Sequence, residues 1–200
     1  MINLGKMVVV EGVMGVGKTT LLHQILREIH IPYVEQDFEH NICLDDFYAG
    51  ADCVFPKQMI FLFSNFHILN SAESNSDCFL SDFCFERSLI MSKKSLMGKE
   101  LSLYEDSYLY LKQKLTFRKM LIFLYGDDRT ILDNIQKRGR PNEKNVTLEY
   151  IESCQRSLLD GIHNIGSDEV ITININEVDI LSQEFVEDLS QKINKFLSLE

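Results

Sequence analysis

Residues 7–20 read MVVVEGVMGVGKTT, and this stretch decides the fold. Residues 7–10 form a short apolar, β-branched run, which is typical of a buried strand. Residues 12–19 then match the pattern G-x-x-x-x-G-K-[ST], and a segment with apolar residues on one helical face follows. A strand, a glycine-rich loop and a helix in this order predict a phosphate-binding loop.

The glycines of this loop let the backbone turn so that successive N–H groups face an anion. Lys18 is placed to reach the β and γ phosphates of a nucleotide, and Thr19 to hold Mg²⁺. The predicted nucleotide-binding residues are Gly12, Gly15, Val16, Gly17, Lys18, Thr19 and Thr20. A glycine turn with a chance Lys-Thr pair is the alternative. The loop alone does not name a reaction, because switches, motors and kinases share it.

The chain of 200 residues has the size of one domain, and its 45% hydrophobic and 25% charged residues are typical of a globular protein. No apolar run approaches the roughly 20 residues of a membrane helix, so we expect no membrane span. The net charge of −10 argues against a broad nucleic-acid surface. Any bound phosphate must therefore meet a local cluster of cations.

Five cysteines are present, an odd number without C-x-x-C or metal-ligand spacing. We interpret them as reduced packing residues. Residues 7–10 are too short for a signal-peptide core, and no cleavage pattern follows them. A cytoplasmic protein is the expectation.

Apolar β-branched runs alternate with segments of helical period along the chain. The expected strands are 7–10, 32–35, 78–85, 119–125 and 170–175. Beyond the helix after the loop, the expected helices are 57–72, 102–116, 128–137, 147–163 and 182–197. This order predicts an α/β fold, with a parallel sheet of about five strands and helices on both faces.

The stretch RGRPNEKN, residues 138–145, is polar and irregular, and Gly139 and Pro141 interrupt helical continuation. Arg138 and Arg140 in such a break suit a lid that closes over phosphates and neutralises developing charge. A solvated basic loop is the alternative. We expect residues 1–200 to form a single P-loop domain with a lid near 138–145.

Charged residues follow two of the expected strands. Glu35 ends the second, and Glu86 with Arg87 ends the third. The carboxyl ends of parallel strands form the edge where ligands bind, so these side chains are candidates for catalysis. The alternatives are an ordinary exposed carboxylate, with Asp37 an equal neighbour of Glu35, and a surface ion pair of Glu86 with Arg87.

Five segments together resemble the deoxyribonucleoside kinase family. They are VVVEGVMGVGKTT, YVEQD, FPKQMIFLFSNF, FERS and KRGRPNEKNVTLEYIE, and they occur in the family's order. Members of the family phosphorylate the 5′-hydroxyl of deoxynucleosides. The resemblance implies a P-loop kinase with ATP and Mg²⁺ as cofactors, a nucleoside substrate and a homodimer formed through helices.

By this resemblance, Glu35 is the general base and Arg87 is the arginine beside the acceptor and the phosphates. Glu86 is the carboxylate near Mg²⁺, and Arg138 and Arg140 are the lid arginines.

The resemblance also assigns the nucleoside pocket. Gln58 corresponds to the glutamine that pairs with the base edge, while Tyr48 and Glu143 correspond to the pair that holds the sugar 3′-hydroxyl. The chain departs from several relatives by having Ser92 in place of an Asp and Asn65 in place of an Arg. Base preference therefore does not transfer, because polar contacts of this kind decide discrimination.

Asn134 likewise stands where an arginine is common. The expected function is ATP-dependent phosphorylation of a deoxynucleoside or related nucleoside. One alternative is a nucleoside monophosphate kinase of thymidylate-kinase type, with Lys93 and Lys94 as cations for the acceptor's phosphate. The other is a protein that binds nucleotide without catalysis.

Overall fold

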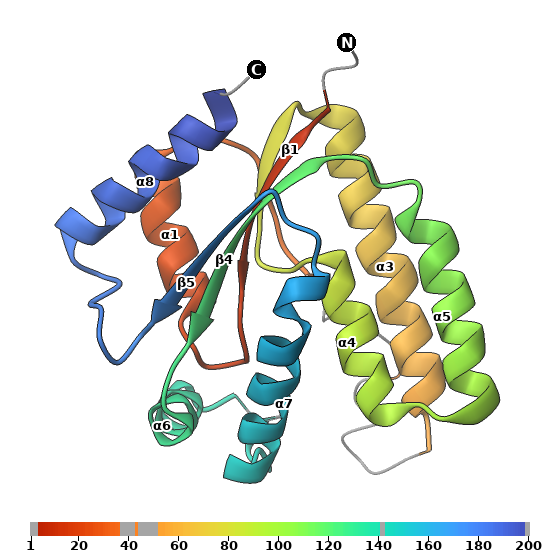
Figure 1. The fold of residues 1–200 in the computed structure, drawn as a ribbon. Coiled ribbons are helices and arrows are strands. Elements are labelled where there is room, and N and C mark those ends of the chain that lie inside the picture. Colours follow the sequence, from red (N-terminus) through yellow and green to blue (C-terminus); the bar gives the residue numbers. More distant parts are fainter. Residues whose placement is uncertain (1–3, 37–42, 44–51, 141–142, 199–200) are drawn as a thin grey trace.

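The computed structural model describes residues 4–36, 43, 52–140 and 143–198. In this part of the chain, parallel strands form one five-stranded sheet in the order β2-β3-β1-β4-β5 (Figure 1). The strands are β1 (Lys6–Glu11), β2 (Tyr33–Val34), β3 (Cys78–Ser81), β4 (Arg118–Tyr125) and β5 (Glu169–Asn174). The predicted α/β class with a parallel sheet is confirmed.

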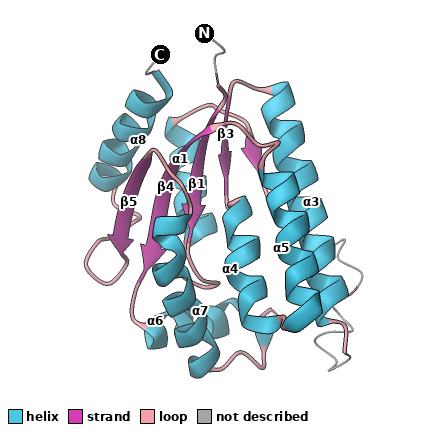
Figure 2. Cartoon of the chain, turned by 45° about the vertical axis from the view of Figure 1, so that its right-hand side comes forward, coloured by secondary structure: helices cyan, strands magenta, loops and turns pink. Residues whose placement is uncertain are grey.

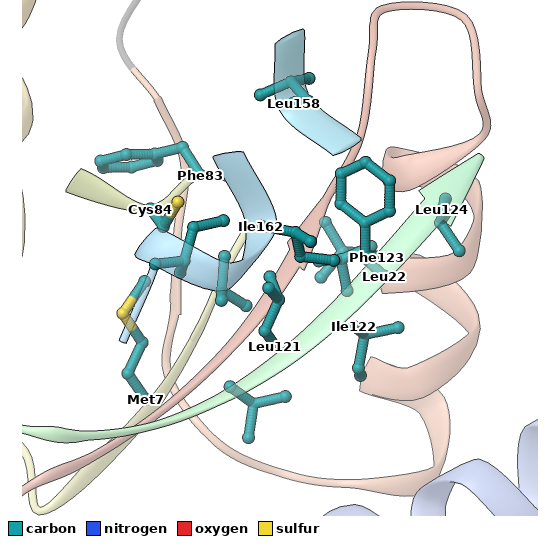
Figure 3. Packing of buried hydrophobic residues seen from close by; sticks show 14 of the residues in the cluster. Met7, Leu22, Phe83, Cys84, Leu121, Ile122, Phe123, Leu124, Leu158 and Ile162 are labelled. Atoms are coloured by element: carbon teal, nitrogen blue, oxygen red, sulfur yellow. The ribbon is translucent and has the colours of Figure 1, made fainter. Parts of the chain in front are cut away.

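The central strands are apolar because both faces of the sheet are covered. Residues 7–10 of β1 and residues 120–124 of β4 have no exposed surface. Neighbouring side chains of β4 alternate between the two faces, so Leu121 and Phe123 lie on one side while Ile122 and Leu124 lie on the other (Figure 3). The apolar runs therefore form the middle layer of the core.

Helices cover both faces of the sheet (Figures 1 and 2). They are α1 (Lys18–Glu28), α3 (Val54–Asn75), α4 (Phe85–Ser95), α5 (Gly98–Lys112), α6 (Asp128–Arg138), α7 (Leu148–Gly161), α8 (Gln183–Ser198) and the short 3-10 helix η2 (Ile162–Asn164). Helices α1 and α8 pack together on one face, while α4 packs against α3, α5 and α7 on the other. None of these described helices is long and apolar enough to cross a membrane.

The third strand is shorter than the sequence predicted. It ends at Ser81, whose hydroxyl donates to the Phe83 carbonyl and accepts from the Phe83 N–H, so the chain turns there. Residues 85–95 form α4, a helix that hydrophobic periodicity did not predict because three of its four buried residues are polar. The expectation of a strand reaching residue 85 is therefore wrong, and the side chains of Glu86 and Arg87 project from a helix.

The core contribution of β4 is testable. Phe123 is fully buried, so Phe123→Ala should lower the free energy of unfolding by about 3 to 5 kcal/mol. Val170→Ala on β5, where the side chain is half exposed, is the control and should change it by less than about 1 kcal/mol. Urea denaturation monitored by circular dichroism measures both, and equal losses would contradict the described core.

Candidate active site

The loop after β1 needs glycine at the predicted positions for steric reasons. Gly12 has φ 146°, and a Cβ there would lie 2.5 Å from the Leu124 carbonyl oxygen on β4. Gly15 has φ 80°, and a Cβ would lie 2.5 Å from Cγ1 of Ile135 on α6. Both backbones are therefore in the left-handed region and in close contact with neighbouring elements. Gly17, with φ 102°, caps the start of α1.

The Lys18 ammonium folds back over the loop. Its Nζ donates to the carbonyls of Gly12, at 2.8 Å, and Val13, at 3.0 Å. Burial and the neighbouring charge of Arg87 lower the pKa of Lys18 to about 8. Thr19 and Thr20 are exposed in the first turn of α1, so their hydroxyls are accessible at the loop.

Val16, also predicted to bind nucleotide, has a buried side chain that belongs to the core. Its backbone N–H makes a long hydrogen bond of 3.4 Å to the Val13 carbonyl. Any contact of Val16 with a phosphate would therefore come from the backbone.

A buried carboxylate joins the loop to α4. Glu11, the last residue of β1, has no exposed surface. Its Oε2 accepts from the Gly12 N–H at 2.9 Å and from Arg87 Nη1 at 2.7 Å, while its Oε1 accepts from the Cys84 N–H at 3.2 Å. Arg87 Nη1 also donates to the Gly12 carbonyl at 2.9 Å. Lys18 and Arg87 thus place two cations on one carbonyl of the loop.

Two further carboxylates lie at this edge of the sheet. Asp82 directly follows β3, and its Oδ1 accepts from the Gln36 N–H at 2.9 Å. Burial is the largest effect on the pKa of Asp82, and it raises the pKa. The Gln36 N–H and Lys18 lower this pKa, Glu35 and Glu11 raise it, and the net shift is upward. Glu35 is exposed directly after β2. The structure therefore brings Glu35, predicted to be catalytic, close to Asp82, which in turn interacts with Lys18 of the phosphate loop.

Glu86 has different neighbours from those that its predicted metal role requires. Its Oε1 accepts from Lys119 Nζ at 2.6 Å and from Lys112 Nζ, and only 4% of the side chain is exposed. Burial alone would raise the pKa of Glu86, but the two lysines outweigh burial and hold the pKa below its usual value. Its placement does not support a metal role at the loop, since the side chain is committed to two lysines.

Gln58, predicted to contact the base, and Asn65 lie on α3, and Ser92 lies on α4. Gln58 Nε2 donates to Ser95 Oγ at 3.1 Å. About two turns further along α3, the buried Asn65 donates to Ser88 Oγ at 3.0 Å and accepts from Gln36 Nε2 at 3.3 Å. Neutral amides and hydroxyls therefore connect α3, α4 and the end of β2.

Ser92, the second departure from the relatives, is fully buried, and its hydroxyl donates to the Leu89 carbonyl at 2.9 Å. It is thus committed within α4. Tyr48, predicted to contact the sugar, lies outside the described residues.

The predicted lid arginines already have an anionic partner. Arg138 makes a bidentate contact with Glu143, with Nη2 at 2.7 and 2.8 Å from the two oxygens, and Arg140 Nη1 lies 3.8 Å from Glu143 Oε1. The sequence placed Arg138 and Arg140 on phosphates and Glu143 on the sugar. The structure brings the three together at the end of α6, which Asn134 ties to the loop through the Gly15 carbonyl at 3.1 Å.

Sequence reasoning missed Glu11 and Asp82 as site residues. Each directly ends or follows a buried strand at the edge where ligands bind in parallel sheets. That position was an available signal for both. The E-R-S resemblance instead directed attention to Glu86.

Comparison with known proteins identifies the family. The model of the family described as Deoxynucleoside kinase matches residues 8–198. Deoxyguanosine kinase of Bacillus subtilis (strain 168) is 30% identical over 158 residues, which cover 75% of each chain. Deoxyadenosine/deoxycytidine kinase of the same organism is 26% identical over 188 residues, which cover 88% of this chain and 86% of that one.

A solved structure of deoxyadenosine kinase from M. mycoides, with products dCMP and a flexible dCDP bound, superposes with a TM-score of 0.80. It is 20% identical and covers 94% of this chain and 99% of its own, so it supports the fold. The resemblance seen in the sequence is confirmed, as is the prediction of an enzyme that uses a nucleotide phosphate donor. The chain belongs to the deoxynucleoside kinase family, and it is a kinase that phosphorylates nucleosides.

Proposed function

We propose that the chain transfers the γ-phosphoryl group of ATP to the 5′-hydroxyl of a deoxynucleoside. The convergence of Lys18 and Arg87 on the Gly12 carbonyl, with Asp82 near Lys18 and Glu35 near Asp82, carries this proposal. Cations for the phosphates and a base for an acceptor hydroxyl are the groups that phosphoryl transfer needs. Residues 1–200 act as one P-loop kinase domain whose lid is near 138–145.

Glu35 accepts the proton of the 5′-hydroxyl as the oxygen attacks the γ-phosphorus of ATP. The bond from that phosphorus to the β,γ-bridging oxygen breaks, which leaves ADP and a nucleoside 5′-monophosphate. Lys18 and Arg87 stabilise the charge on the phosphoryl oxygens. Arg138 and Arg140, in the lid, stabilise the same charge. The backbone N–H groups of Gly15, Val16, Gly17, Lys18, Thr19 and Thr20 are the donors that face the nucleotide phosphates.

The residues fit a magnesium ion at the loop. Mg²⁺ in such enzymes needs few protein ligands because phosphates and water complete its shell, and no cluster of three metal-binding side chains occurs among the described residues. The Thr19 hydroxyl and the Asp82 carboxylate would hold the ion, with Asp82 replacing the predicted Glu86. When bound, Mg²⁺ supplies charge neutralisation for the phosphates.

The preferred substrate is a deoxynucleoside whose base contacts Gln58 and the neutral group around Asn65. The names of the relatives make purine deoxynucleosides and deoxycytidine the first to test. The nucleoside monophosphate alternative is less supported, since Lys93 pairs with Glu105 on α5 and Lys94 donates to Ser153 on α7.

The proposed assembly is a homodimer formed through helices. Phe63 on α3 and Leu103 and Tyr110 on α5 are each more than half exposed, which supports these two neighbouring helices as the interface. The side chains of Cys78, Cys84 and Cys154 are not in disulfides, which supports a cytoplasmic location.

The acceptor and the base can be tested together. Purified protein with Mg²⁺-ATP should convert a deoxynucleoside to its 5′-monophosphate, identified by mass. Ribonucleosides and nucleoside monophosphates are tested separately as alternative acceptors. Glu35→Gln should lower kcat by about 10²- to 10⁴-fold while ATP binding is retained. Lys18→Ala is the control for contaminating kinase. Retained turnover in Glu35→Gln, or phosphorylation of monophosphates alone, would contradict the proposal.

Asp82→Asn tests the magnesium assignment. The amide oxygen can still accept from Gln36, so the loop should keep its shape while the negative charge is lost. The Mg²⁺ concentration for half-maximal activity should rise by at least about tenfold. Asp188→Asn, which removes an exposed ion pair on α8, is the control and should leave it unchanged. An unchanged requirement in Asp82→Asn would exclude Asp82 as the ligand.

Nucleotide affinity should depend on the charge of Lys18. Phosphate oxygens favour the ammonium form, so they raise its pKa on binding, and nucleotide binding then takes up a proton above pH 8. The Kd for ADP should therefore rise roughly tenfold between pH 7 and pH 9. Calorimetry in buffers of different ionisation enthalpy measures both effects. Lys18→Arg should bind more weakly but without this pH dependence, and a flat profile in the wild type would refute the assignment.

A further inference from the structure

Two adjacent residues of α4 are attached to opposite ends of the same pair of strands. Arg87 contacts Glu11 and Gly12 at the carboxyl end of β1. Glu86 contacts Lys119, which pairs in register with Met7 near the beginning of β1. Since Met7 and Glu11 are four residues apart, the two attachment points are separated by roughly 13 Å along the strand. The first turn of α4 thus contacts the carboxyl end of β1 through Arg87 and the opposite end of the β1–β4 pair through Glu86.

The attachment through Glu86 is a buried charge cluster. Lys119 Nζ lies 2.6 Å from Glu86 Oε1 and 3.2 Å from the carbonyl oxygen of Ile165, and both charged side chains are 4% exposed. Lys112, at the end of α5, contacts the same carboxylate oxygen. A charge buried this deeply has no water to replace a lost partner, so the contact constrains position strongly.

The cluster also contains a buried polar atom whose hydrogen-bonding capacity is not satisfied. Glu86 Oε2 is buried and has no hydrogen-bond partner among the described atoms. A carboxylate held by one oxygen in an apolar setting contributes little stability compared with an apolar pair of the same shape. Fold stability alone therefore gives a poor account of these residues, whereas a role in fixing geometry accounts for their burial.

We propose that Glu86 is a positioning residue, which with Lys119 and Lys112 orients the first turn of α4 so that Arg87 faces the phosphate loop. The proposal rests on the proposed function, because it acts through the contact of Arg87 with the reacting phosphates. It replaces the role in metal binding that the sequence suggested for Glu86.

The test is a mutant cycle measured by steady-state kinetics. Glu86→Gln should lower kcat at least tenfold without raising the Mg²⁺ concentration for half-maximal activity. In the Arg87→Ala background the same substitution should change kcat by less than twofold. Glu105→Gln, which removes the exposed ion pair between α4 and α5, is the matched control and should leave kcat unchanged.

A second variant separates positioning from folding. The double variant Glu86→Gln with Lys119→Met removes both buried charges. Its melting temperature should return to that of the wild type, while its kcat should remain low. Recovery of kcat together with the melting temperature would overturn the proposal, as would an equal loss of kcat with and without Arg87. A raised Mg²⁺ requirement in Glu86→Gln would restore the metal role instead.

Failure of the proposed function is a different result, because the wild type itself would then turn over no nucleoside. The same variants are in that case compared by calorimetric binding of ATP. Glu86→Gln should weaken ATP binding at least threefold with Arg87 present and should have no effect in its absence. Equal effects in both backgrounds would overturn the positioning role independently of the reaction.

Discussion

The buried carboxylate of Glu11 is the interaction on which the rest of the site depends. It is a charge without exposed surface, and it is stabilised by the N–H of Gly12, the N–H of Cys84 and the guanidinium of Arg87. These donors come from the loop, the start of α4 and its first turn. Because an unpaired charge at this depth is costly, the three segments must meet at one point. The phosphate loop and its arginine are therefore built as one unit.

The nucleoside side is constructed differently. Its described polar contacts are neutral, and they run from Gln36 through Asn65 to Ser88. Ser88 follows Arg87 in the chain, and Gln36 follows Glu35. The residues that would read a base are thereby linked to the residues that would do chemistry. In the proposed function, a substrate that displaced these amides would also shift Glu35 or Arg87, which would tie selectivity to rate.

The sequence predicted the fold well because residues 7–10 and 120–124 are buried on both faces, and such strands read as continuous apolar runs. The loop was equally clear, since its glycines are imposed by sterics. Helix α4 was missed because three of its four buried residues are polar. Adjacent helical residues point about 100° apart, so Glu86 and Arg87 serve different partners, and no spacing rule shows which of the two faces the loop. The carboxylates that lie at the loop, Glu11 and Asp82, were recognisable only by their place at strand ends.

The tight contact at Gly15 determines which part of the lid can move. A Cβ at this glycine would lie within 3 Å of Ile131 and Ile135, and Asn134 donates to its carbonyl, so α6 and the loop are in direct contact. The first left-handed residue after this contact is Gly139, which ends the helix with φ 66°. In the proposed lid, a hinge at Gly139 would leave Arg138 on the side of α6 and place Arg140 on the moving side. The two arginines of the proposed lid would thus act differently, Arg138 from the fixed helix and Arg140 from the segment that closes.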